Sequence, residues 1–486
     1  MTGYDVHLLL VSILGLGALV AVGEGLRRWG ISTVATRRLV HGGVCLFVVV
    51  SPWLFDGPGP IYLLAGGFVL ANGTAWILDW WPGIHAARPD SWGTVALPLA
   101  LIPALGATWT VAPDRIVFLQ IAFLIHGLAD PLASWMGQKA GRRPLVGKAT
   151  AEGSAMFFGV AVVVASAVLL EGAGWTVERA LATAVVVSVV ATGIEAICRH
   201  GWDNFFVVIG VILVLVPIHG TPGALVTISR ALVLGLGFGA AAYAGRTLNK
   251  EGAVGGGLFA ASLLGLGGWA WATPGFVFFV LSSTLSLVDG AVSAGDGESE
   301  GRTLRQVLAN GGISWGFLGV FAVAPSDAAV LRAVCYAGFL GALAAAAADT
   351  WATEIGVRSA EHPWSLRTFS RVEAGVSGAV SGMGTVGGAL GAASVAGAAF
   401  LTGEAFGVTH WIPGLKIVGS GMMGMAVDSV VGATLQVRYR DPDTGRLVEE
   451  APASPAAPSL GWTAIDNETV NLAGTTAGAV AAILLV

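Results

Sequence analysis

Runs of about 17–25 mostly apolar residues recur along the whole chain, and each is long enough to cross the hydrocarbon core of a bilayer as an α-helix. Only 11% of the 486 residues are charged, against about a quarter in an average soluble domain. Glycine is abundant, with 71 residues, and small residues let helices approach closely in lipid. The sequence therefore predicts an all-α, polytopic integral membrane protein.

The apolar runs predict about sixteen transmembrane helices, of which the eleventh is short enough to be re-entrant. If successive loops alternate between the two sides, most of the 25 lysine and arginine residues fall on one side, which the positive-inside rule identifies as the cytoplasm. Both termini are then expected outside, and the net charge of −5 indicates no nucleic-acid partner. The predicted helices lie near residues 6–23, 39–55, 60–78, 93–111, 115–133, 153–171, 180–198, 204–219, 223–243, 253–271, 275–288, 307–323, 329–348, 375–401, 413–435 and 465–485.

A short pattern, AD-x-x-A-[ST]-x-x-G, occurs twice, in LADPLASWMG (128–137) and in AAADTWATEIG (346–356). RRLVHGG precedes the first copy, and LRQVLANGG precedes the second. An Asp-Asn pair follows each copy several helices later. The order of these features predicts two related halves with the same orientation in the membrane. We place them at 1–222 and 223–486, with a long cytoplasmic loop at 436–464 in the second half.

The repeat matches three acidic residues of the first half with three of the second, each at the predicted cytoplasmic end of its helix. A carboxylate at a helix end in lipid costs a few kcal/mol unless it is paired or binds a cation. Magnesium takes oxygen ligands, typically one or two carboxylates together with substrate phosphates. For any single acid, pairing with a nearby arginine explains its presence equally well. The six candidate metal ligands are Asp130 and Asp349, Glu195 and Asp428, and Asp203 and Asp466.

Basic loops that follow the two copies are candidates for binding phosphate. Lys148 or Arg142 in the first copy, and Arg367 or Arg371 in the second, carry suitable charge. EGS at 152–154 and GVSG at 375–378 are each predicted to open a helix, where free N–H groups and the helix dipole favour phosphate. The second set of candidates is therefore Gly153, Ser154, Gly375 and Ser377.

Two polar residues near the start of the repeat have two interpretations. His41 and Asn310 are candidates for positioning substrate, and packing between helices explains them as well. His126 has no metal-ligand spacing and receives no role.

Carboxylates beside a basic, glycine-bearing loop suit phosphoryl transfer, in which positioning and charge neutralisation supply most of the catalysis. The main alternative is a cation- or proton-coupled transporter, which also uses repeats with intramembrane acids. Transporter sites lie near the bilayer midplane, whereas these acids are predicted at its cytoplasmic edge. A membrane cytidylyltransferase is a further alternative, and release of pyrophosphate in place of CDP would identify it.

Several of these stretches resemble known families. RRLVHGG, RPDSWGTVALPLA, GLADPLASWMGQKAGRRPLVGKATAEGSAMFF and IEAICRHGWDN resemble the phytol kinase and dolichol kinase group of CTP-dependent lipid-alcohol kinases, over roughly residues 25–220. GRTLRQVLANGG, AAADTWATEIG, EAGVSGAVSGMGTVGGALGA, GMAVDSVVGATLQ and IDNETVN are similar to the uncharacterised membrane family that includes phytyl-phosphate kinase, over roughly residues 225–486.

The resemblance implies that the first half converts an isoprenoid alcohol from the bilayer to its monophosphate and the second half converts the monophosphate to the diphosphate, with CTP and Mg²⁺. The sequence departs from the kinase group at one position: Ala149 stands where that group has lysine before Thr150, and Lys148 lies one residue earlier. Either Lys148 reaches the phosphate from a shifted backbone, or the first site is weakened. The site residues that the resemblance implies are Asp130, Lys148, Gly153, Ser154, Glu195, Asp203, Asn204, Arg305, Asn310, Asp349, Glu354, Gly375, Ser377, Asp428, Asp466 and Asn467.

Overall fold

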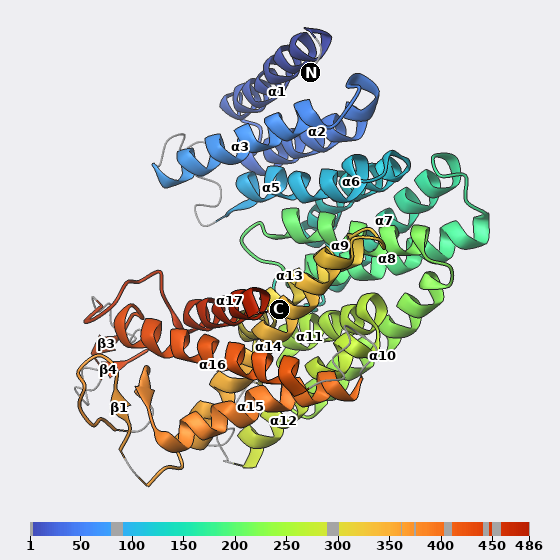
Figure 1. The fold of residues 1–486 in the computed structure, drawn as a ribbon. Helices are drawn as coiled ribbons and strands as arrows, with labels where there is room; N and C mark the ends of the chain where they lie inside the picture. The colour runs from blue at the N-terminus through green and yellow to red at the C-terminus, as the bar shows by residue number, and fades with distance from the viewer. Residues whose placement is uncertain are drawn as a thin grey trace. The chain divides into compact units, whose positions relative to one another are not determined.

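The fold is known from a computed structural model, drawn in Figure 1, that describes most of the chain. The described residues are 3–78, 91–288, 301–360, 362–373, 376–402, 411–440, 447–449 and 458–485. Within them lie sixteen α-helices, of which 14 are long and apolar enough to cross a membrane. The prediction of an all-α polytopic membrane protein is confirmed.

The chain divides into two compact units, Met1–Ser229 and Arg230–Val486. The division falls within α10, whereas the sequence places the boundary in the loop before that helix. The helices of unit 1 are α1 (Gly3–Arg28), α2 (Thr33–Leu54), α3 (Gly59–Ile77), α5 (Gly93–Leu105, prolonged by a π-helical turn at Gly106–Thr110), α6 (Ile116–Ala140), α7 (Ala151–Glu171), α8 (Val177–Ile197) and α9 (Asp203–Gly220).

Unit 2 follows with further helices and two short antiparallel strand pairs. Its elements are α10 (Ala224–Ala244), α11 (Lys250–Ser262, prolonged by a π-helical turn at Leu263–Gly267), α12 (Trp269–Val288), α13 (Leu304–Val323), α14 (Ala329–Gly356), β1 (Trp364–Ser365), β2 (Ala379–Val380), α15 (Gly382–Leu401), α16 (Trp411–Thr434), β3 (Tyr439–Arg440), β4 (Leu447–Val448) and α17 (Asn467–Leu485). Each predicted apolar run falls on one of the helices of the two units. The run at 275–288 is part of the 20-residue α12.

The same sequence of helix pairings occurs inside each unit. In unit 1, α2 packs on α6, α6 on α7, α7 on α8, α8 on α9, and α6 on α9. In unit 2, α13 packs on α14, α14 on α15, α15 on α16, α16 on α17, and α14 on α17. The helices that carry matched motifs therefore have matched neighbours, as expected for related halves.

The alanine run of α14 serves as a packing platform in unit 2. Ala344–Ala348 are all buried, because glycines of the surrounding helices press against this stretch. A Cβ added at Gly391 of α15 would lie 2.5 Å from the carbonyl oxygen of Ala347, and one added at Gly421 of α16 would lie 2.9 Å from that of Ala344. Small residues on both sides allow this backbone contact, so the three helices converge beside Asp349.

Candidate functional site

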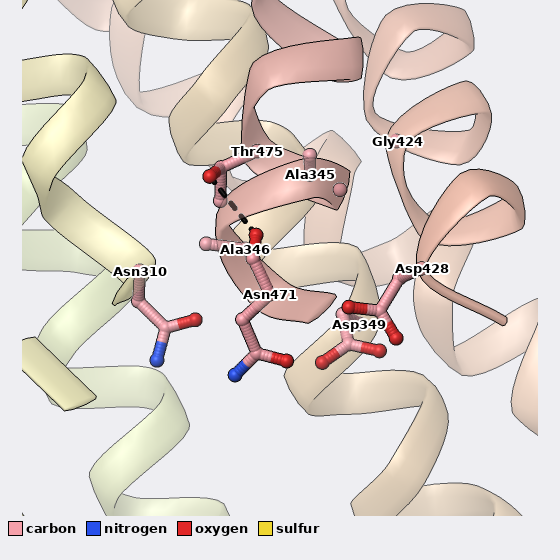
Figure 2. A pocket seen from close by; sticks show the side chains of 9 residues that line it. Asn310, Ala345, Ala346, Asp349, Gly424, Asp428, Asn471 and Thr475 are labelled. Atoms are coloured by element: carbon pink, nitrogen blue, oxygen red, sulfur yellow. Dashed lines mark hydrogen bonds between the residues drawn. The ribbon is translucent and has the colours of Figure 1, made fainter. Parts of the chain in front are cut away.

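In unit 2, a narrow cleft lies between four helices. Asn310 of α13, Asp349 of α14, Asp428 of α16 and Asn471 of α17 supply its polar lining. Figure 2 shows both carboxylates side by side, with the amides of Asn310 and Asn471 across the cleft from them. The structure thus brings together two of the predicted carboxylates and the predicted Asn310.

The carboxylates of Asp349 and Asp428 lie against each other and interact electrostatically, and Oδ2 of Asp428 is buried and has no hydrogen-bond partner within the described residues. Two ionised carboxylates in contact repel each other, so this arrangement requires a shared proton or a bound cation. A buried acceptor without a donor is costly, and a cation satisfies it. This pair is the strongest candidate for a cation site in unit 2.

Close glycine contacts hold the pair in place. A Cβ added at Gly424 would lie 2.4 Å from Cβ of Ala345, and one added at Gly474 would lie 3.0 Å from Cβ of Asp428. Helices α14, α16 and α17 therefore meet at backbone distance on either side of the cleft. The predicted acids reach each other because these positions carry no side chain.

The acids lie near one end of long helices, although α6 and α14 continue for several residues beyond them. At 1.5 Å per residue, Asp349 lies about 30 Å from the start of α14 at Ala329. Asp130 lies about 25 Å from Pro113, where the apolar span containing α6 begins. The hydrocarbon core of a bilayer is about 30 Å thick, so both aspartates fall near its edge if these spans begin at the opposite interface.

Asp466, the third predicted acid of unit 2, has different partners from the pair. Its carboxylate caps α17 by accepting hydrogen bonds from the backbone and hydroxyl of Thr469, and Arg305 donates to it. Partial burial would raise the pKa of Asp466, but these hydrogen bonds outweigh burial and hold the pKa below its usual value. Asp466 and Arg305 are thus paired with each other, and Asn467 is the exposed first residue of α17.

Glu354, another predicted site residue, takes part in a contact away from the Asp349–Asp428 pair. Its Oε1 accepts a hydrogen bond from the Ser286 hydroxyl at 2.7 Å, and Arg302 donates to the same hydroxyl at 3.2 Å. This network ties α14 to α12 and to the segment before α13. Glu354 is not among the residues that line the cleft.

In unit 1, the three predicted acids converge. Asp130 of α6, Glu195 of α8 and Asp203 of α9 are close enough that each interacts electrostatically with the other two. Oε2 of Glu195 is buried and lacks a hydrogen-bond partner within the described residues. Arg37 of α2 interacts electrostatically with Asp203 and supplies positive charge beside the cluster.

A buried hydrogen-bond chain adjoins this cluster, and it includes a residue that the sequence left without a role. Nε2 of His126 donates to Oδ1 of Asn204 at 2.8 Å, and Nδ2 of Asn204 donates to the carbonyl oxygen of Gly93 at 2.7 Å. His41 of α2 donates through Nε2 to the carbonyl oxygen of His126 at 3.3 Å. The available signal was the spacing of His126 and Asp130, since residues four apart lie on one face of a helix.

The basic loop of unit 1 lies between α6 and α7. Lys148 is exposed, and the backbone N–H groups of Arg142 and Arg143 donate to the Glu152 carboxylate. Thr150 caps α7, and the hydroxyl of Ser154 is buried without a hydrogen-bond partner within the described residues. The prediction that this stretch opens a helix is confirmed.

The corresponding prediction for unit 2 is wrong. GVSG at 375–378 does not open α15, which begins at Gly382. Gly375 lies outside the described residues, and Ser377 lies in the turn before β2, where its hydroxyl donates to Gln436 at 2.5 Å. Gly378 follows with a positive φ of 71°, so the backbone turns into the short strand pair instead of a helix. Arg371 donates to the carbonyl oxygen of His362.

The actual counterpart of the Thr150 cap is Ser381. The hydroxyl of Thr150 accepts from the N–H of Gly153 at 3.2 Å, and that of Ser381 accepts from the N–H of Gly384 at 3.0 Å. Because the spacing is the same, Gly384 and Thr385 take the positions that the sequence analysis gave to Gly375 and Ser377.

The last glycine of each repeated motif contacts this cap. A Cβ added at Gly137 would lie 3.2 Å from Oγ1 of Thr150, and one added at Gly356 would lie 3.3 Å from Oγ of Ser381. The motif therefore fixes the approach of α6 to α7 and of α14 to α15 in the same way. The hydroxyl caps at Thr150 and Ser381 are thus each held beside the helix that carries the repeated acid.

Within the described residues, no group of three or more His, Cys, Asp and Glu side chains has the arrangement of a metal site. A divalent cation in unit 2 would have two carboxylates, Asp349 and Asp428, together with amide or phosphate oxygens. Magnesium is commonly held in this way in sites that bind substrate phosphates.

Comparisons with known proteins place unit 2 in a family. The family model described as "Integral membrane protein DUF92" matches residues 233–479. An uncharacterized membrane protein of Methanocaldococcus jannaschii is 33% identical over 196 residues, which cover 39% of this chain and 76% of the relative. No solved structure matches the chain. The chain belongs to the DUF92 family of integral membrane proteins.

Proposed function

We propose that the protein is a CTP- and Mg²⁺-dependent lipid kinase with two consecutive activities. Unit 1 would phosphorylate an isoprenoid alcohol, and unit 2 would phosphorylate the resulting monophosphate to the diphosphate. The observation that carries the proposal is the Asp349–Asp428 contact with its unpartnered carboxylate oxygen, across the cleft from two asparagine amides. The resemblance of the sequence motifs to lipid-kinase families supplies the reaction.

The donor set fits magnesium. Asp349 and Asp428 present carboxylate oxygens, and the amide oxygens of Asn310 and Asn471 are uncharged oxygen donors of the kind this ion accepts. When bound, the ion would neutralise charge on the nucleotide phosphates. In unit 1, Asp130, Glu195 and Asp203 are the corresponding carboxylates. They do not have the arrangement of a metal site, and the observation that favours a cation there is the Glu195 oxygen without a hydrogen-bond partner within the described residues.

The remaining groups suit the binding of phosphate beside each acid cluster. Lys148 is an exposed cation in the loop before α7, and the N-terminal end of that helix, at Ala151, carries the positive end of the helix dipole, which favours anions. In unit 2, α15 begins in the same relation to α14. In phosphoryl transfer, most of the catalysis comes from such positioning and charge neutralisation.

The depth of the acids supports a kinase over a transporter. If α14 and the span that contains α6 begin at the opposite interface, Asp130 and Asp349 lie near an edge of the hydrocarbon core, whereas transporter sites lie near the midplane. At this edge, a nucleotide from water can meet a lipid whose polar end lies at the interface. This geometry explains why such a reaction would be carried out by membrane helices.

The test uses purified full-length protein in detergent with CTP, Mg²⁺ and geranylgeraniol, and product analysis by chromatography. The expected products are the monophosphate, the diphosphate and CDP. Asp349→Asn should stop the reaction at the monophosphate. Asp130→Asn should abolish turnover of the alcohol and leave turnover of added monophosphate intact.

Three results would contradict the proposal. Absence of any phosphorylated lipid would exclude the kinase, and release of pyrophosphate would indicate a cytidylyltransferase. Equal loss of both steps in Asp130→Asn and Asp349→Asn would exclude the division of labour between the units. Asp327→Asn, in an exposed position between α13 and α14, is a charge-matched control that should retain both steps.

A further inference from the structure

The two units differ in one chemical respect at their acid clusters. The residue before the paired glycines of RRLVHGG is His41, and the residue before those of LRQVLANGG is Asn310. Four residues before Asp130 stands His126, and four residues before Asp349 stands Ala345. Asn310 and Ala345 both line the unit 2 cleft, so these are positions at the site itself. Unit 1 thus has two imidazoles where unit 2 has an amide and a methyl group.

The surroundings of His41 determine which of its nitrogens carries the proton. Nε2 lies 3.3 Å from the carbonyl oxygen of His126, and a carbonyl can only accept, so Nε2 is the N–H donor. Nδ1 of the neutral ring is then a free acceptor, and no hydrogen bond to it is found within the described residues. His41 is half-buried and interacts electrostatically with Asp130, so the free acceptor belongs to a ring beside the acid cluster.

His126 holds His41 in this orientation. The two rings meet edge to face with centroids 4.7 Å apart, and His126 is completely buried. Its own ring is fixed by Asn204, which is fixed in turn by the Gly93 carbonyl. Helices α2 and α6 approach closely here, since a Cβ added at Gly42 would lie 3.6 Å from the Gly127 carbonyl oxygen.

We propose that His41 is the general base of unit 1, and that it removes the hydroxyl proton of the acceptor alcohol while His126 and Asn204 position it. This inference rests on the proposed kinase function and assigns its two half-reactions to different chemistry. The hydroxyl of an alcohol keeps its proton at neutral pH, so its attack on phosphorus benefits from a base. The phosphate monoester accepted by unit 2 is already an anion, because its second pKa is about 6.

The O–H bond of the alcohol breaks, its proton moves to Nδ1 of His41, and the oxygen forms a bond to the γ-phosphorus of CTP. The bond between that phosphorus and its bridging oxygen breaks, and the electron pair leaves with CDP. The imidazolium then returns the proton to water. The charged or titratable groups that face His41 are Arg37, Cys45, His126 and Asp130.

The experiment compares wild type with His41→Asn and His41→Gln in the full-length protein. Asn reproduces the residue that unit 2 carries at this position, and Gln retains an N–H donor for the His126 carbonyl. Both should lower kcat for geranylgeraniol by about 10²–10⁴-fold, the usual contribution of a general base. The KM for CTP and the turnover of added geranylgeranyl monophosphate should remain at wild-type values.

A second substrate distinguishes a lost base from a distorted site. The 2-fluoro analogue of the alcohol, with fluorine in place of the vinyl hydrogen at C2, has a more acidic hydroxyl and depends less on a base, so the variants should recover a larger share of the wild-type rate with it. Equal loss with both alcohols, a raised KM for CTP, or wild-type kcat in His41→Gln would overturn the assignment. If wild type itself forms no phosphorylated lipid, the proposed function fails first, which separates the two outcomes.

Discussion

The carboxylates of Asp349 in α14 and Asp428 in α16 lie side by side in one cleft, although a strand pair and a further helix separate the two residues in the chain. None of the residues that line their cleft has a basic side chain. The charge of the pair must therefore be reduced by a proton or balanced by a cation. This requirement leads to the first prediction.

Asp428→Asn should allow a hydrogen bond to Asp349 and remove the repulsion between two carboxylates. We expect the variant without Mg²⁺ to be at least as stable as wild type, because its amide can donate to Asp349. Mg²⁺ at one hundred times its dissociation constant should stabilise wild type by about 2.7 kcal/mol and have little effect on the variant. Thermal unfolding in detergent, with and without Mg²⁺ and CTP, measures this difference. Equal stabilisation of wild type and variant would argue against a cation at the pair.

The glycine contact beside the pair gives the second prediction. Gly424→Ala would place a Cβ 2.4 Å from Cβ of Ala345 and 2.6 Å from the Gly474 carbonyl oxygen, so α16 must move away from α14 and α17. We expect a loss of about 1–3 kcal/mol in the free energy of unfolding, as for overpacking in a core. Monophosphate turnover should fall with it.

Gly419→Ala in the same helix is the matched control for this change. A Cβ at Gly419 meets nothing within 4 Å, so the substitution should be neutral or stabilise by about 0.5–1 kcal/mol. Denaturant titration of both variants followed by tryptophan fluorescence compares them. Similar stability of the two variants would show that α16 is free to shift at this point.

The third prediction concerns sidedness. Gln138 at the end of α6 is expected in the cytoplasm, and Asp327 before α14 is expected outside; both are exposed. In a Cys198→Ser background, where the remaining Cys45 and Cys335 are buried, a membrane-impermeant maleimide should label Asp327→Cys on intact cells. Gln138→Cys should be labelled only after permeabilisation. The reverse pattern would invert the topology and place both acid clusters at the outer face.

Much of the candidate site was visible in the sequence, because a carboxylate in an apolar helix is conspicuous. The same property made Asp349, Asp428, Asp130 and Glu195 stand out, and the structure brings Asp349 beside Asp428 in unit 2 and Asp130 near Glu195 in unit 1. Asp466 stood out equally, but it caps α17 and pairs with Arg305. A pattern of spacing does not reveal which partner a carboxylate will find.

Other residues of the two sites were missed because their roles depend on contacts with residues far away in the chain. Asn471 lines the unit 2 cleft because α17 presents it toward Asp349; it is the last residue of the IDNETVN stretch, but the sequence did not single it out from its neighbours. His126 acquires its role through Asn204 and Gly93, which lie far from it in the chain. These positions depend on contacts between helices, which local patterns do not encode.

The sequence by itself determined the helices and the repeat, since hydrophobic length and local spacing are properties of contiguous residues. Tertiary structure decided which glycines bring backbones together, which hydroxyl caps α15, and which acids share a cleft. The Ser381 cap shows the difference, because its equivalence to Thr150 follows from the contact of each with the motif glycine at 356 or 137. Such contacts join segments separated in the chain, and only the packed helices establish them.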